Sequence, residues 1–386
     1  MLPCVMYAAA PAAPAKFAAL AELVAKMTLA KFVMPDIRQD VDLLTSRVQE
    51  FANGKIPLPK GVAVRNGYIS IYLKDFAPML CPDGCTTART FSERMDEGFL
   101  AMANGKVAPT TFLRENLGWS AYFLNGSIVI DVRRLLNPDY VRDNPEALNL
   151  LAFLFISGIF CFDLEEGVSC SDKFSREDAS VAKIFLWAAK QGSICALHNY
   201  GHCLAYGVGV EQNRDEAVKI YRTIVENERE LARFRGVLAM AQYRYGLCFF
   251  WGNGVEKNQK EAAKYLKLSA DNGNALAQYN YGICLKEGIG VDINPEDAAK
   301  YYKLAADQGY AKAQCRYGTL LVQGDGVEEN LAEAAKYYKL AADQGDCDGL
   351  HHYGECLESG IGVEENLEEA AKYYQLAADQ GYSEFA

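Results

Sequence analysis

Residues Ala275–Tyr310 read ALAQYNYGICLKEGIGVDINPEDAAKYYKLAADQGY, and Ala311–Asp346 repeat the pattern at once as AKAQCRYGTLLVQGDGVEENLAEAAKYYKLAADQGD. Further copies precede and follow this pair, in Ala239–Asn274 and Cys347–Tyr382. One glycine marks the period, since it recurs every 36 residues, at Gly246, Gly282, Gly318 and Gly354. A fixed period of this length is typical of a stacked solenoid, which offers a long surface but no ready-made catalytic cleft.

Each unit is predicted to be a pair of helices. In Ala275–Tyr310 the apolar residues Ala277, Tyr281 and Leu285 recur at helical spacing around Gly282. A glycine inside a helix costs about 1 kcal/mol relative to alanine, so its recurrence predicts close packing against the second helix. That second helix opens on Asn294-Pro295, an N-cap followed by proline in the first turn. Glycines at the phase of Gly309 fit the left-handed residue that ends a helix.

The shared motif is Ala-x-x-x-Tyr-Gly-x-x-Leu, then Gly-x-Gly-Val, then Ala-Ala-Lys-Tyr-Tyr-x-x-Ala-Ala-Asp-x-Gly. It resembles Sel-one-like repeats, which are relatives of tetratricopeptide repeats, and the resemblance covers about residues 150–382. The resemblance implies a right-handed α/α superhelix that serves as an adaptor or scaffold in protein complexes. The family supplies no catalytic residues that could be assigned to positions of this chain.

The fold class that we expect is mainly α, with a solenoid of about six repeats in residues 146–386 behind an N-terminal region of unknown type in residues 1–145. The predicted repeats are a divergent first copy at 151–193, then 194–238, 239–274, 275–310, 311–346 and 347–382. The N-terminal region begins with a flexible stretch rich in alanine and proline. Two amphipathic helices, Lys16–Phe32 and Asp36–Ala52, and short strands at Tyr68–Leu73 and Ser127–Val132 are predicted to follow in a small mixed domain.

Composition and charge exclude some classes of function. The chain has 386 residues, half of them apolar, and a net charge of −11. Cys347–Tyr382 alone carries eight acidic side chains and one lysine, a net charge of −7. This argues against nucleic acid, whose binding requires positive charge, and suits a partner with a basic surface. The longest apolar run, Ala147–Phe162, is too short for a membrane span.

Cysteine usage points to a reducing compartment. Several of the twelve cysteines, among them Cys248, Cys284 and Cys356, occupy the apolar face of the first helices, where cysteine behaves as a small buried hydrophobe. No secretory signal is evident at the N-terminus. We therefore expect a cytoplasmic protein.

Two groups of side chains were weighed as metal sites. Cys81 and Cys85 flank a turn, but no second pair follows at the spacing of a zinc finger. His198 and His202 lie one helical turn apart without a third ligand, and His198 has a counterpart at His351, which indicates a repeat position. Together with the lack of a phosphate loop or nucleophile motif, this predicts no catalytic residue, no cofactor and no metal site.

The functional surface is predicted where the repeats differ while the frame stays constant. The sixth, ninth and thirteenth positions of the first helix fall opposite its core face at about 100° per residue, a side that lines the concave groove in the tetratricopeptide relatives. Aromatic, amide and arginine side chains on this stripe have the composition of interaction hot spots. The predicted partner-binding residues are Asn199, His202, Tyr206, Arg244, Trp251, Asn280, Arg316 and His352.

The function that we expect is a non-catalytic scaffold or adaptor that binds a protein or peptide along the concave face. Two other classes stay open at this stage. Residues 1–145 could be a divergent enzyme or sensor domain, with the repeats serving only for targeting. The protein could also be a self-assembling structural protein, a homo-oligomer that pairs through its C-terminal repeat.

Overall fold

The computed structural model describes residues 36–42, 45 and 46, four strands between residues 62 and 131, residues 141, 148 and 152, and then residues 177–229, 231 and 235–379. The predicted helix Lys16–Phe32, the pair Cys81 and Cys85, and most of the divergent first repeat lie outside these residues. Among the described helices, none is long and apolar enough to cross a membrane.

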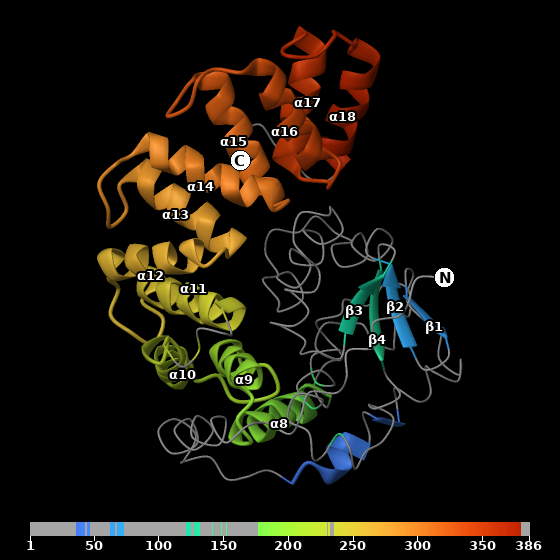
Figure 1. Cartoon of the computed structure of the whole chain (residues 1–386). Coiled ribbons are helices and arrows are strands. Elements are labelled where there is room, and N and C mark those ends of the chain that lie inside the picture. Colours follow the sequence, from blue (N-terminus) through green and yellow to red (C-terminus); the bar gives the residue numbers. More distant parts are fainter. Residues whose placement is uncertain are drawn as a thin grey trace, which may run out of the picture.

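The second half of the described chain is a curved stack of helix pairs (Figure 1). Within a repeat the two helices pack on each other, and the second helix packs on the first helix of the next repeat. This confirms the predicted α/α solenoid. The helices are α8 (Glu177–Lys190), α9 (Ile194–Tyr206), α10 (Arg214–Glu226), α11 (Arg235–Trp251), α12 (Gln259–Asp271), α13 (Ala275–Glu287), α14 (Pro295–Asp307), α15 (Ala311–Gln323), α16 (Leu331–Ala342), α17 (Cys347–Ser359) and α18 (Leu367–Asp379).

The helix ends follow from local chemistry. The side chain of Asn294 accepts a hydrogen bond from the backbone N–H of Asp297, which caps α14 as predicted. At the other end, Gly309 has φ of 94°, a left-handed conformation that glycine adopts without strain. The first helix α13 likewise ends at Gly288, with φ of 71°. These signals depend only on neighbouring residues, so the sequence shows them directly.

The recurring glycine lets the two helices of a repeat approach closely. A Cβ atom at Gly282 would lie 2.8 Å from the ring of Tyr302, and one at Gly318 would lie 2.9 Å from the ring of Tyr338. Both distances are shorter than van der Waals contact. The prediction that this glycine marks close helix packing is therefore confirmed.

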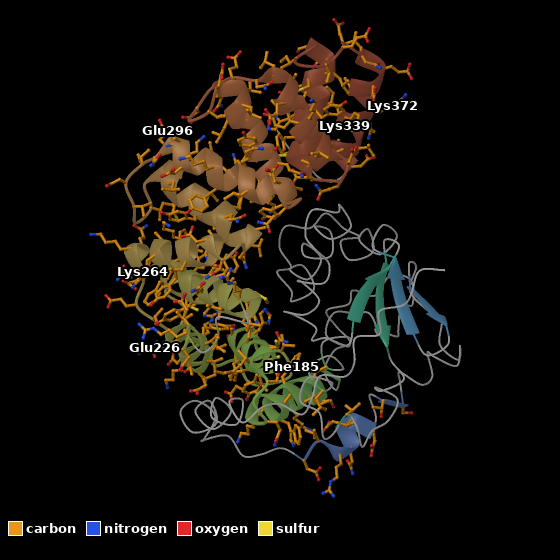
Figure 2. The ribbon with its side chains drawn as sticks, in the orientation of Figure 1. Phe185, Glu226, Lys264, Glu296, Lys339 and Lys372 are labelled. Atoms are coloured by element: carbon orange, nitrogen blue, oxygen red, sulfur yellow. The ribbon has the colours of Figure 1, made fainter. Side chains whose placement is uncertain are left out.

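Neighbouring repeats are joined by side-chain hydrogen bonds that recur with the period. The hydroxyl of Tyr337 donates to Asp307 Oδ1 at 2.7 Å across the boundary between two repeats. Across the same boundary, Nε2 of buried Gln314 donates to the backbone carbonyl of Ala306 at 3.1 Å. On the outer side of the arc, the second helices carry charged side chains such as Lys264 and Glu296 (Figure 2). Polar contacts thus lie between neighbouring repeats, and charged side chains of the second helices face solvent on the outer side.

The N-terminal region contains a four-stranded antiparallel sheet. Its strands are β1 (Val62–Arg65), β2 (Tyr68–Tyr72), β3 (Ala121–Leu124) and β4 (Ser127–Asp131), in the order β1-β2-β4-β3. The central pair aligns Tyr68 with Asp131. The strands predicted at Tyr68–Leu73 and Ser127–Val132 are confirmed as β2 and β4. The sheet also includes β1 and β3, which the sequence did not indicate.

A short helical segment links the N-terminal region to the solenoid. Residues 38–42 are helical, within the predicted helix Asp36–Ala52. Asp40 in this segment accepts a hydrogen bond from Ser180 Oγ at 2.6 Å and lies 3.5 Å from Lys183 Nζ. Because both partners belong to α8, the segment contacts the first described helix of the stack.

Candidate partner-binding pocket

The eight residues predicted to bind a partner differ in their exposure. Tyr206 and Trp251 are exposed, with 44% and 56% of their surface in solvent. Arg316 is also exposed, whereas Asn280 and His352 are half-buried. The structure places the remaining three in the interior: Asn199, His202 and Arg244 are buried.

For Asn199, His202 and Arg244 the expected exposure is therefore wrong. The first two lie on α9, which is buried from Ile194 to Leu204 on every side of the helix. This helix packs on α8, α10 and α11. A helical period separates the two sides of a helix, but it does not reveal whether another element covers the polar side.

Three of the predicted residues, Tyr206, Arg244 and Trp251, line one cavity of about 400 Å³ at the junction of α9, α10 and α11. All three come from the predicted stripe on the first helices. Asn199, His202, Asn280, Arg316 and His352 do not line it. The other lining residues are Ala205, Arg214, Ala217, Tyr221, Leu247, Cys248 and Asn253.

A buried guanidinium is the main polar group of this pocket. Arg244 Nη1 donates to the hydroxyl of Tyr206 at 3.0 Å, and its guanidinium carbon lies 5.5 Å from the centre of the same ring. The Tyr206 ring in turn stacks on His202 at 4.5 Å between ring centres. Buried His202 thus supports a pocket residue instead of facing a partner itself. The hydrogen bond and the ring contact with Tyr206 thus position the Arg244 charge before any ligand arrives.

Two guanidinium groups line the pocket although the protein as a whole is acidic. Arg214 supplies a second guanidinium from the first turn of α10, where the helix dipole adds partial positive charge. Among the described residues, none that lines the pocket is acidic and no ion pair includes Arg244. Burying a cation without an opposite charge is costly, so an anionic group in this cavity would be stabilised.

Sequence reasoning missed Arg214, and the reason is structural. The stripe was defined on the first helix of each repeat, whereas Arg214 begins a second helix. The signal that could have found it is the break in the pattern, because the corresponding residues that begin later second helices are Gln259, Pro295 and Leu331.

The pocket is suited to recognition. Burial raises the pKa of the Cys248 thiol to about 12, so the thiol is neutral and a poor nucleophile at neutral pH. The remaining lining side chains supply aromatic and aliphatic surface together with the two guanidinium groups. The pocket therefore presents an apolar surface and two cationic groups side by side.

Comparison with known proteins places the repeats in a family. The Sel1 repeat matches residues 196–224, 239–274, 275–310, 311–346 and 347–382. A solved Sel1 repeat protein from Oxalobacter formigenes is 29% identical, covers 50% of this chain and 76% of its own, and superposes with a TM-score of 0.44. The antigen c5321 of uropathogenic Escherichia coli, described as protective and as displaying an SLR fold, is 27% identical and superposes with a TM-score of 0.50.

The match to c5321 covers 62% of this chain and 46% of that protein, so the chain spans about half of the length of this relative. No curated protein matches the chain. The helix pairs, the joints between them and the matched residues agree on one architecture. Residues 196–382 of this chain are Sel1 repeats stacked as an α/α solenoid.

Proposed function

We propose that the protein is a non-catalytic scaffold that holds a protein partner along the concave face of the stack and anchors it in the pocket between α9, α10 and α11. The observation that carries this proposal is the pocket itself, where Arg244, Arg214 and Trp251 line one cavity and no acidic residue of the described chain lines it with them. Sel1 repeats are generally scaffolds for protein interactions, which supports the same class of function.

The chemistry of the pocket defines the anchor. A carboxylate of the partner would pair with the guanidinium of Arg244, which is already held by Tyr206. An adjoining apolar side chain would cover Trp251, which exposes 56% of its surface. The helices are formed before binding, so the ordering entropy falls mainly on the partner. The anchor is therefore an acidic residue next to an apolar one in an extended or loop segment.

The far end of the stack has the opposite charge. The last repeat, Cys347–Tyr382, has a net charge of −7, so a basic part of the same partner would be attracted there. We place the interaction in the cytoplasm. Free thiols at Cys248, Cys284, Cys315 and Cys356 support a reducing compartment.

A displayed library of random peptides tests the proposal with the full chain as bait. We expect enrichment of peptides that carry Asp or Glu beside an aromatic or aliphatic residue. Binding of the enriched peptides should weaken about tenfold or more in Trp251→Ala and in Arg214→Gln, because both side chains line the pocket. These two positions are exposed, so the substitutions should leave the fold intact.

Matched controls make the same chemical changes away from the pocket. Leu304→Ala removes an exposed apolar side chain on α14, and Lys336→Gln removes an exposed cation on α16. Neither should change peptide binding. Enriched peptides without an acidic residue, or equal binding to the pocket variants and the controls, would refute this pocket as the anchor.

A further inference from the structure

Three side chains of α17 that the proposed scaffold function does not use converge on one point: His351, His352 and Glu355. Their potential ligand atoms all lie within 4.8 Å of one another. We propose that these three residues form a binding site for a divalent transition metal ion such as Zn²⁺. The site is independent of the pocket between α9, α10 and α11.

Helix geometry explains why these positions meet. With 3.6 residues per turn, Glu355 lies about 40° around the helix from His351 and about 60° from His352, on the arc between them. Its two carboxylate oxygens reach both rings: Oε1 lies 3.4 Å from His351 Nε2, and Oε2 lies 2.8 Å from His352 Nδ1. The carboxylate therefore already bridges the two imidazoles.

These distances suit a small tetrahedral ion. Ligand atoms about 2.1 Å from Zn²⁺ are about 3.4 Å from one another. The two nitrogen–oxygen distances are 3.4 and 2.8 Å, to different oxygens of Glu355, and the potential ligand atoms of the three residues all lie within 4.8 Å of one another. Small side-chain rotations would therefore bring three ligand atoms to the spacing that the ion requires. A set of two imidazoles and one carboxylate binds borderline-soft ions such as Zn²⁺ in preference to Mg²⁺ or Ca²⁺.

Neighbouring helices hold both rings in place. The ring of Tyr338 on α16 packs on His352 with ring centres 5.0 Å apart, and the ring of Tyr374 on α18 packs on His351 at 5.4 Å. Such support from outside the ligands reduces the cost of ordering a site. An ion can reach the site from solvent through His352 and Glu355, whose side chains expose 34% and 48% of their surface, whereas His351 exposes 13%.

Charge and comparison within the chain favour the same site. The repeat Cys347–Tyr382 is the most acidic of the last three, with a net charge of −7, so cations concentrate around it. At the same three positions the preceding repeat has Cys315, Arg316 and Thr319, which include a cation and form no ligand set. The set of two histidines and one glutamate is thus absent from the preceding repeat. The sequence predicts no metal site, because its pattern assigns His351 to a repeat position shared with His198.

Isothermal titration of the reduced full chain with Zn²⁺ tests the proposal. We expect one ion per chain at this site. His352→Gln and Glu355→Gln should each raise the dissociation constant for Zn²⁺ about tenfold or more. Glu364→Gln, the same change at an exposed acid of the same repeat, should leave the dissociation constant unchanged. Circular dichroism and the melting temperature without metal show that each variant is folded.

Titration with Co²⁺ distinguishes this site from the cysteines of the chain. Coordination by imidazole and carboxylate gives visible bands without the intense near-ultraviolet charge-transfer band of a thiolate ligand. Three results would overturn the proposal: no Zn²⁺ binding to the wild-type chain, equal affinity in His352→Gln and Glu355→Gln, or a thiolate band that accounts for all bound Co²⁺.

Discussion

Gly324 and Gly326 lie in one loop and share a left-handed backbone, with φ of 64° and 70°, yet we expect alanine at the second to cost far more. At Gly324 a Cβ atom would find its nearest neighbour 3.8 Å away, which is ordinary contact. At Gly326 it would collide with the carbonyl group of Pro295, the first residue of α14 in the preceding repeat. Only the second substitution therefore disturbs the joint between repeats.

The expected magnitudes follow from these two environments. Left-handed backbone costs a residue with a side chain about 1–2 kcal/mol, which both variants incur. Gly326→Ala must also displace main-chain atoms of Pro295, which are fixed at the start of α14, and overpacking of this kind costs about 1–3 kcal/mol more. We expect destabilisation by about 1–2 kcal/mol for Gly324→Ala and about 2–5 kcal/mol for Gly326→Ala.

Urea unfolding followed by circular dichroism measures both effects. With an unchanged slope, the transition midpoint falls in proportion to the free energy lost. The Gly360 and Gly362 pair provides a repetition of the experiment one repeat later, because a Cβ atom at Gly360 would find its nearest neighbour 3.7 Å away and one at Gly362 would meet the carbonyl group of Leu331. Equal midpoints for Gly324→Ala and Gly326→Ala would refute the view that this glycine is required by repeat stacking.

Three further predictions concern the same stack. Gly318→Ala should lower the urea midpoint because its methyl group meets the ring of Tyr338. In a Tyr338→Leu background the same change should instead raise the free energy of unfolding by about 1 kcal/mol, the difference in helix propensity between alanine and glycine. The same sign in both backgrounds would be inconsistent with the clash. Tyr337→Phe should lower the free energy of unfolding by about 0.5–1.5 kcal/mol, because the hydrogen bond to Asp307 is lost. A double-mutant cycle with Asp307→Ala should show coupling between the two positions, and strict additivity would contradict a hydrogen bond that joins the two repeats. Alkaline pH should destabilise the stack, because burial raises the pKa of the Cys284 and Cys356 thiols from 9.0 to about 11. The contribution of these neutral thiols to the free energy of unfolding is complete below pH 9 and is lost as the pH rises to about 11. An unchanged urea midpoint between pH 8 and pH 10.5 would contradict this prediction.

Recognition of the candidate sites from sequence was incomplete. Tyr206, Arg244 and Trp251 lie together in one pocket because the stripe of variable positions follows the helical period. Arg214 is absent from the predicted set because it comes from a second helix, and His351 is assigned to a repeat position although it meets Glu355 on the same helix. In both cases the signal is a departure from the motif at one repeat, which a search for the shared pattern ignores.

The sequence by itself determined the architecture of the repeats. Caps such as Asn294 and left-handed glycines such as Gly309 act within a few residues, and stacking requires only that neighbouring units match. The period therefore contains the information for each helix pair and for each joint. Nothing further along the chain is needed to specify them.

The tertiary structure alone decided which polar residues are buried and which side chains meet. A helical period assigns Asn199 and His202 to the side away from the core, but α9 is packed on all sides, so these residues are buried. The pocket likewise depends on how α9, α10 and α11 come together, which no single helix encodes. Burial and convergence are properties of the whole assembly of helices, because they depend on what covers a surface and not only on which surface a residue occupies.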